Sequence, residues 1–250
     1  MENVYIYLVF LSDIVGQQEV KTRLLKMVKE NRLPHALLFN GVDGSGNLAT
    51  AVAFAQYLFC TNRQTNDSCG TCPSCIKTSK LVHPDLHFVF PIIKSKYVKS
   101  SADLIKEFRE AFLEAPYLNI NDWCDFLGAE NKQPIIPVEE SGHIIKELSY
   151  TSYEGVYKMM IIWQPEKMNT EAANRLLKVL EEPPEQTIFM LVCNNPDALL
   201  STIISRVQQI PFVRLTESEI AEGLVKKFEV TSDNAKQAAF LCDGNFNEAI

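Results

Sequence analysis

The sequence predicts an α/β fold, in which a parallel β-sheet is covered by helices on both faces. Two kinds of segment alternate between the N-terminus and Pro211. Short apolar runs, rich in β-branched and aromatic residues, have the composition of strands that are buried on both faces. The longer segments between them carry apolar residues at helical spacing. This alternation is typical of a parallel sheet whose strands are joined by helices.

The strands and helices can be placed in chain order. We expect strands at His35–Asn40, Asp85–Phe90, Tyr157–Trp163 and Thr187–Cys193. Helices are predicted at Val20–Asn31, Asn47–Phe59, Ala102–Glu114, Ser141–Leu148 and Glu171–Leu180. The segment Gly128–Pro137 contains Pro and Asn, so an irregular connection is expected there.

The helix at Glu171–Leu180 has the clearest local signals. Asn169 or Thr170 can cap its first turn, and Pro183-Pro184 end it. One apolar stripe should face the core, formed by Ala173, Leu176, Leu177 and Leu180.

After Pro211 the alternation stops, and helices are predicted at Glu217–Phe228, at Asp233–Leu241 and from near Phe246. We therefore expect one domain at residues 1–211 and a small helical domain at residues 212–250. The last residue is apolar and lies just after a predicted helix start. This suggests that the helical domain is incomplete and that the chain is part of a longer protein.

Composition narrows the class of protein. A hydrophobic fraction of 46% is enough for a large core, and the net charge of −7 gives no sign of non-specific binding to nucleic acid. The apolar run Val4–Leu11 is too short to span a membrane and lacks the features of a signal peptide. We expect a cytoplasmic protein without a membrane partner, whose seven cysteines are thiols or metal ligands.

A glycine loop follows the first predicted strand. Its residues Gly41, Gly44 and Gly46 have the frame of a phosphate-binding P-loop, but Asn47 and Leu48 stand where a working loop has Lys and Ser or Thr. Asn47 has no charge for the β- and γ-phosphates, and Leu48 has no oxygen for Mg²⁺. What remains is a loop whose backbone N–H groups can approach an anion.

The strand that should supply a second metal ligand is also altered. A P-loop ATPase needs an acidic pair after an apolar strand to hold Mg²⁺ and orient water. Here Met159–Ile162 is followed by Trp163-Gln164-Pro165-Glu166, so the pair is absent. The loss of both elements argues against ATP hydrolysis.

Four cysteines within 16 residues form a C-x8-C-x2-C-x2-C pattern, at Cys60, Cys69, Cys72 and Cys75. Four thiolates at this spacing can surround Zn²⁺ in a closed, structural site, which we expect as a module at about residues 60–80. Disulfides, chance clustering and an iron–sulfur cluster are the alternatives. Buried thiols are expected at the other three cysteines, Cys124, Cys193 and Cys242.

Several stretches resemble one family in combination. They are Asp13–Gln17, Arg32–Ala36, the cysteine module, Asn174–Pro184 and Thr202–Arg206. From about Ser12 to its end, the chain resembles the delta-prime subunits of bacterial DNA polymerase III clamp loaders. Without this resemblance, Arg206 in the pair Ser205-Arg206 would be interpreted as an ordinary surface arginine.

The resemblance implies a RecA-like AAA+ domain, a helical lid and a collar domain that this chain lacks. It also implies a subunit that hydrolyses no ATP and offers an arginine to a neighbouring ATPase. Arg206, preceded by Ser205, would be that arginine finger. The implied partners are the gamma/tau and delta subunits and, through the complex, primed DNA and the sliding clamp.

Two departures from the family pattern stand out. Val207 replaces the usual Cys after the arginine, which should affect packing only. The lid signature Gly-x-x-Arg reads Gly244-Asn245-Phe246-Asn247, so the nucleotide-sensing arginine is lost.

Two other functions remain open. An active gamma/tau-type ATPase would need unusual residues to compensate for Asn47 and Leu48. A stand-alone zinc-ribbon protein that binds nucleic acid would need a basic patch around Cys60–Cys75. That region offers only Arg63, Lys77 and Lys80 against Asp67.

Overall fold

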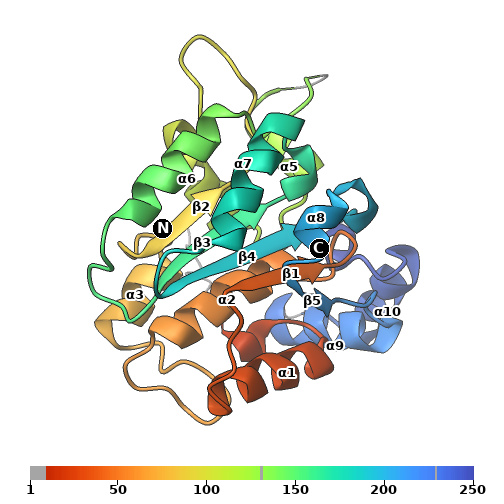
Figure 1. Cartoon of the computed structure of the whole chain (residues 1–250). Helices are drawn as coiled ribbons and strands as arrows, with labels where there is room; N and C mark the ends of the chain where they lie inside the picture. Colours follow the sequence, from red (N-terminus) through yellow and green to blue (C-terminus); the bar gives the residue numbers. More distant parts are fainter. Residues whose placement is uncertain (1–9, 130–131, 229) are drawn as a thin grey trace.

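The computed structural model describes residues 10–129, 132–228 and 230–250. Its centre is a parallel sheet of five strands in the order β2-β3-β4-β1-β5 (Figure 1). The strands are β1 (Ala36–Asn40), β2 (Leu86–Val89), β3 (Lys158–Trp163), β4 (Thr187–Cys193) and β5 (Gln208–Pro211). The four strands predicted from the sequence are confirmed.

The register brings the ends of three strands together. Asn40, the last residue of β1, lies opposite Cys193 of β4 and Pro211 of β5. The segments that follow β1, β4 and β5 therefore start at one edge of the sheet. We call this the carboxyl edge and the opposite one the amino edge.

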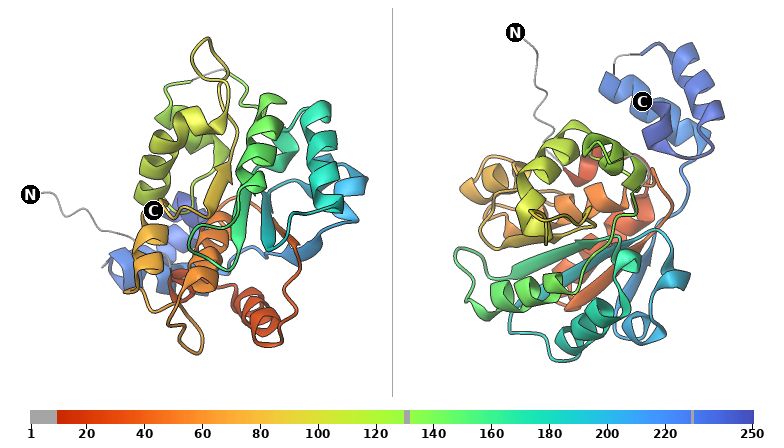
Figure 2. Two further views of the ribbon diagram at one scale, coloured as in Figure 1. Left: turned by 60° about the vertical axis from the view of Figure 1, so that its left-hand side comes forward. Right: turned by 90° about the horizontal axis from the view of Figure 1, so that it is seen from above.

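Helices cover both faces of the sheet (Figure 2). One face packs against α1 (Gln18–Lys29), α2 (Asn47–Phe59), α4 (Ile105–Glu114) and α5 (Ile120–Phe126). The other packs against α6 (Glu139–Ser149), α7 (Thr170–Glu181) and α8 (Ser201–Ile204). Two separate apolar clusters result, because successive strand residues point to opposite faces. Leu37 and Phe39 belong to the first cluster and Leu38 to the second.

Among the described residues, α2 is the most deeply buried helix. All its residues from Asn47 to Phe59 are buried. It contacts β1, β3 and β4 and also α3 (Pro73–Ser79), which belongs to the cysteine region. Four alanines in its sequence allow the close approach that burial on all sides requires. The P-loop at its start and Cys60 at its end are therefore attached to a rigid element.

Helix α7 forms as predicted. The Asn169 side chain caps it by accepting a hydrogen bond from the Ala172 N–H at 2.8 Å. Leu176 and Leu180 are buried, whereas Leu177 is only partly buried. At its end, His35 Nε2 donates to the Leu180 carbonyl oxygen at 3.2 Å. This bond joins two of the stretches that carry the family resemblance.

The last part of the chain forms a third apolar cluster. It contains α9 (Glu217–Phe228), α10 (Ser232–Leu241) and the 3-10 turn η5 (Phe246–Ala249). Phe246 is fully buried in this cluster and packs against Tyr117 of the sheet domain. The predicted helices are confirmed, and Figure 2 shows them beside the sheet. The boundary between residues 1–211 and 212–250 stays a prediction.

Some elements differ from the expectations. Ala102–Glu114 begins as the 3-10 turn η2 (Ser101–Leu104) before α4. The segment Gly128–Pro137 contains two isolated bridges, from Ile135 to Ile92 and from Ile136 to Met168. The sequence did not predict α3, α5, α8 or β5; in β5 only Ile210 is buried, which explains its weak signal. Most of the run Val4–Leu11 lies outside the described residues.

Within the described ranges, no helix combines the length and the apolar character needed to cross a membrane.

Candidate functional site

The glycine loop lies at the carboxyl edge, between β1 and α2. Gly44 and Gly46 have φ values of 71° and 83°, in the left-handed region that favours glycine. Gly46 is the N-cap of α2, so the loop leads into a helix N-terminus as a P-loop does. The backbone frame predicted at Gly41, Gly44 and Gly46 is therefore present.

Side chains of the chain itself hydrogen-bond to one another and to the backbone at this loop. Asn47 donates through Nδ2 to Asn194 Oδ1 at 3.0 Å and to the Gly41 carbonyl oxygen at 3.3 Å. Asn194, the first residue after β4, in turn donates to Asp43 Oδ1. The amide that replaces the P-loop lysine thus ties the loop to the end of β4. Leu48 is buried in the apolar core and offers nothing to a metal.

Asp43 gives the loop an acidic character. Its burial raises the pKa of the carboxyl group, and the negative charges of Asp122, Glu166 and Glu248 act in the same direction. The hydrogen bond from Asn194 partly opposes them. A phosphate entering here would meet the Asp43 carboxyl group and would lack the lysine of a working loop, whose position Asn47 takes.

The acid that follows β3 serves the backbone. Glu166 Oε1 accepts hydrogen bonds from the N–H groups of Asn194 and Asn195, at 2.8 and 3.0 Å. It lies in a 3-10 turn that starts at Pro165, after Gln164 in a left-handed conformation. This carboxylate therefore holds the turn after β4, and no acidic pair stands directly after β3.

The C-terminal cluster packs directly on the glycine loop. A Cβ atom added to Gly44 would lie 1.8 Å from Asn245 Oδ1. Asn247, the last residue of the expected lid signature, donates through Nδ2 to Asp122 Oδ2 at 2.6 Å. Gln17 closes the loop from the side, donating to the carbonyl oxygens of Ser45 and Val213 at 3.2 and 2.6 Å. Gln17 ends the matching stretch Asp13–Gln17, and these bonds give that stretch a structural role.

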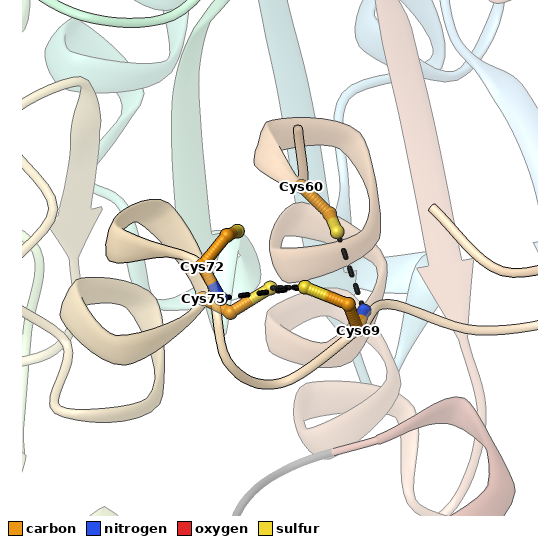
Figure 3. A group of neighbouring side chains, drawn as sticks. All are labelled: Cys60, Cys69, Cys72 and Cys75. Carbon is orange, nitrogen blue, oxygen red and sulfur yellow. Dashed lines mark hydrogen bonds between the residues drawn. The ribbon is translucent and has the colours of Figure 1, made fainter. Parts of the chain in front are cut away.

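The four predicted cysteine ligands lie together (Figure 3). Their sulfur atoms all lie within 4.8 Å of one another, and Cys69 Sγ is 4.0 Å from Cys75 Sγ. All four are free thiols. Tetrahedral Zn²⁺ with Zn–S bonds of about 2.3 Å needs sulfur atoms about 3.8 Å apart. The group therefore fits a metal ion of this kind.

The backbone lowers the pKa of two of the four cysteines, Cys69 and Cys72, whereas burial raises the pKa of Cys60 and Cys75. The Cys69 N–H donates to Cys60 Sγ, and the Cys72 N–H donates to Cys69 Sγ, both at 3.3 Å. Burial opposes ionisation of Cys72, but hydrogen bonds from the backbone of Cys75 and Thr61 outweigh it and lower the pKa of Cys72 to about 6. Helix α3, which starts at Pro73, sets the position of Cys75.

The cysteine loop also holds the beginning of the described chain. Asp67 accepts hydrogen bonds from the N–H groups of Leu11 and Ser12, at 3.2 and 2.9 Å. A Cβ atom added to Gly70 would lie 2.5 Å from the ring of Phe10, so this ring needs a glycine beneath it. Of the other cysteines, Cys193 and Cys242 are buried as predicted, whereas Cys124 is only partly buried.

Arg206 lies near the opposite end of the strands from the glycine loop, although β1 and β5 are neighbours in the sheet. It comes two residues before β5 begins, at the amino edge, whereas the loop follows β1 at the carboxyl edge. Its Nη1 donates to the Thr202 carbonyl oxygen at 2.9 Å and to Ser205 Oγ at 3.2 Å. Its Nη2 lies 2.6 Å from Glu181 Oε1. About a third of the Arg206 side chain is exposed, at 36%.

The sequence reasoning therefore found the glycines, the cysteines and Arg206, but it missed three residues that contact them. Asp43 and Asn194 complete the network inside the loop, and Glu181 pairs with Arg206. Position offered a signal for Asn194, because it directly follows a buried strand at the edge where the loop starts.

Comparison with known proteins shows the family to which this chain belongs. A family model described as DNA polymerase III, delta subunit, matches residues 16–216. The chain belongs to this family. The delta-family chain is 31% identical over 236 residues to DNA polymerase III subunit delta' of Bacillus subtilis, covering 93% of this chain and 59% of that protein. This confirms the resemblance recognised in the sequence.

Other relatives include both kinds of subunit. The delta-family chain is 32% identical to subunit delta' of Yersinia pestis, over 69% of this chain and 39% of that protein. It is 29% identical to subunit tau/gamma of Haemophilus influenzae, over 85% of this chain and 25% of that protein. The delta-family chain thus spans less than two thirds of the length of these relatives.

Solved structures support the fold. The RuvB Holliday junction branch migration motor of Thermotoga maritima aligns with a TM-score of 0.53 at 16% identity. The alignment covers 96% of the delta-family chain and 61% of RuvB. The predicted RecA-like AAA+ architecture is confirmed, with a parallel sheet, flanking helices and an inserted cysteine cluster.

The acidic loop gives a prediction for stability. Asp43→Asn removes a charge that burial disfavours and keeps an oxygen that can accept from Asn194. Because the folded-state pKa is raised, ionisation of Asp43 destabilises the fold as the pH rises through that pKa. We expect the variant to have a higher free energy of unfolding than wild type at pH 7, and the difference to vanish below the ordinary Asp pKa of about 3.9.

Urea unfolding followed by circular dichroism across this pH range measures the difference. Asp197→Asn, at an exposed acid in the turn after β4, is the control and should change little. A stability of Asp43→Asn that is equal to or lower than wild type at pH 7 would contradict the electrostatic account of the loop.

Proposed function

We propose that the chain is a non-hydrolysing delta-prime subunit of the DNA polymerase III clamp loader, which supports loading of the sliding clamp onto DNA. The observation that carries the proposal is an asymmetry. The Asn47, Asn194 and Asp43 side chains are hydrogen-bonded to one another at the glycine loop, while Arg206 stays at the surface. A subunit that assists the active site of a neighbour, but has none of its own, needs this combination.

The loop contacts support the absence of ATP turnover. Asn47 uses its amide inside the chain, Glu166 holds the backbone after β4, and Asp43 adds negative charge. Mg²⁺–ATP would therefore lose its lysine, its metal ligands and the space beside Gly44 that Asn245 occupies.

The place of Arg206 supports action on another subunit. This side chain lies at the amino edge, and the only glycine loop in the described residues lies at the carboxyl edge. A guanidinium at this place can reach a phosphate only if a neighbour presents one. There it would stabilise the charge that develops on the transferred phosphoryl group. We propose that Ser205 helps to orient it, through the bond from Arg206 Nη1 to Ser205 Oγ.

The proposed partners follow from the family. They are the gamma/tau and delta subunits of the loader and, through the complex, primed DNA and the sliding clamp. We propose a cytoplasmic location, where replication takes place in bacteria. The helices at residues 212–250 would be part of the lid, and a collar domain would belong to the longer relatives.

The rival zinc-ribbon function finds less support. Arg63 donates to the carbonyl oxygens of Tyr57 and Leu58, and Lys77 pairs with Glu154. Two of the three basic residues of the cysteine region are thus used within the chain. Little positive charge remains for a phosphate backbone.

The similarity to tau/gamma subunits favours a second candidate function, an active ATPase subunit. ATP titration separates the two. Because the lysine and the metal ligands are missing, we expect no turnover, and binding too weak to saturate at cellular nucleotide concentrations. Calorimetric titration of ATP into the purified full-length protein, with a phosphate-release assay, measures both. Binding with a Kd of about 1 μM, together with hydrolysis, would support the ATPase instead.

We further propose that Zn²⁺ is the metal held by Cys60, Cys69, Cys72 and Cys75. Four thiolates leave no open coordination position, so the ion would stabilise the loop and take no part in catalysis. We expect about one zinc ion per chain in protein purified without added metal. Metal analysis of wild type, Cys72→Ser and the control Cys124→Ser measures this, and only Cys72→Ser should lose most of the metal. Metal-free protein with the four cysteines in disulfides, isolated from a reducing cytosol, would refute the proposal.

The arginine finger is tested by Arg206→Ala in a reconstituted loader. We expect the complex to assemble, because the side chain is partly exposed and at the surface. Hydrolysis by the adjacent ATPase should fall by a factor on the order of 10³–10⁵, the effect of such an arginine in phosphoryl transfer. The bulk rate will fall less if other ATP sites remain intact.

ATPase activity stimulated by DNA and clamp, and clamp loading itself, provide the measurements. Arg23→Ala, at an exposed arginine on α1, serves as the control. If the assembled Arg206→Ala complex loads clamps at the wild-type rate, Arg206 has no role beyond that of a surface charge.

A further inference from the structure

Glu181 forms an ion pair with Arg206, and the proposed function assigns it no role. Glu181 is the last residue of α7, and its Oε1 lies 2.6 Å from Arg206 Nη2. Arg206 Nη1 is engaged by the Thr202 carbonyl oxygen and Ser205 Oγ. Both terminal nitrogens of the guanidinium therefore have acceptors within the chain.

A phosphate competes with these acceptors. An arginine binds a phosphate most strongly through a fork of two parallel N–H···O bonds. Arg206 can offer a pair of nitrogens that includes Nη2 only after Glu181 has released it. Of the three acceptors, Glu181 is the only one that carries a negative charge, so it is the strongest competitor for the guanidinium.

Both partners of this ion pair are attached to fixed backbone. Glu181 follows the buried Leu180, whose carbonyl oxygen bonds to His35, and Pro183 ends the helix two residues later. Arg206 stands between Ile203 and Val207, which are both buried. The pair therefore forms between two anchored helix ends, and only the two side chains need to move to break it.

We propose that Glu181 is a positioning residue that holds Arg206 in a retracted state until the nucleotide of the neighbouring subunit displaces it. The inference rests on the proposed function of Arg206. In the retracted state the arginine is neutralised and held against its own helix end. A nucleotide with a full set of phosphates displaces the carboxylate, so the neighbouring site gains its arginine only when ATP is bound there.

The size of the effect follows from the exposure of the pair. The side chains are 36% and 42% exposed, so water and salt screen their attraction. An exposed ion pair of this kind changes the equilibrium constant between its paired and separated states by a factor of about 1.4 to 5. Removal of Glu181 should lower the KM for ATP at the adjacent site by such a factor. It should leave kcat unchanged, because the engaged state of Arg206 does not contain the ion pair.

The experiment uses the reconstituted loader with Glu181→Gln, which keeps the shape of the side chain and removes its charge. Glu182→Gln is the matched control, since Glu182 carries the same charge one residue later and forms no ion pair among the described residues. The part of the ATPase rate that is lost in Arg206→Ala defines the signal of this site. The KM and kcat of that part are compared between wild type and the two Gln variants.

We expect Glu181→Gln to lower KM about 1.4- to 5-fold at unchanged kcat, and Glu182→Gln to behave as wild type. If Arg206→Ala removes activity but the two Gln variants are alike, the retracted state is refuted and the arginine finger stands. If Glu181→Gln lowers kcat, Glu181 presents the arginine instead of withholding it, and the proposal also fails. If Arg206→Ala changes nothing, both the finger and the retracted state are refuted.

Discussion

The hydrogen bonds around Asn194 hold together the edge of the sheet on which the rest of this structure depends. Its side chain bonds to Asn47 and Asp43, and its backbone N–H bonds to Glu166. One residue thus connects the turn after β3, the end of β4 and the glycine loop between β1 and α2. In a nucleotide-binding relative, the same place must stay open for phosphates and a metal ion. Here the side chains of Asn47, Asp43 and Glu166 hydrogen-bond to Asn194 at this place.

The two edges of the sheet carry different kinds of residue. The carboxyl edge is closed by its own side chains and by the packing of Asn245 on Gly44. The amino edge keeps an exposed cation, Arg206, beside the end of α7. Parallel strands make this separation possible, because each strand carries the chain from one edge to the other before a helix returns it. The glycine loop and Arg206 are therefore held in place by different parts of the chain.

The sequence predicted those features that depend on local pattern. Strong apolar runs located β1 to β4, and helix α2 begins and ends where its pattern predicts. The spacing of the four cysteines correctly predicted that their sulfur atoms lie close together. The sequence did not reveal the partners of Asp43 and Arg206. Asn194 and Glu181 lie far from them along the chain and meet them only in the fold. Strand β5 was missed since only Ile210 is buried, and its pairing depends on β1 being in place.

The bonds from Asp67 to the backbone of Leu11 and Ser12 have a consequence for the order in which the molecule comes apart. Those two residues begin the short segment that leads to Val15, whose N–H donates to the Tyr117 hydroxyl, and to Gln17, which closes the glycine loop. A cysteine loop that lost its shape would release this segment first. Movement of the segment could then reach the glycine loop, because about six residues separate Leu11 from Gln17, a reach of about 20 Å when fully extended. The cysteine loop thus holds the N-terminal segment in place, and the rate of proteolysis of that segment would report whether the bonds from Asp67 are formed.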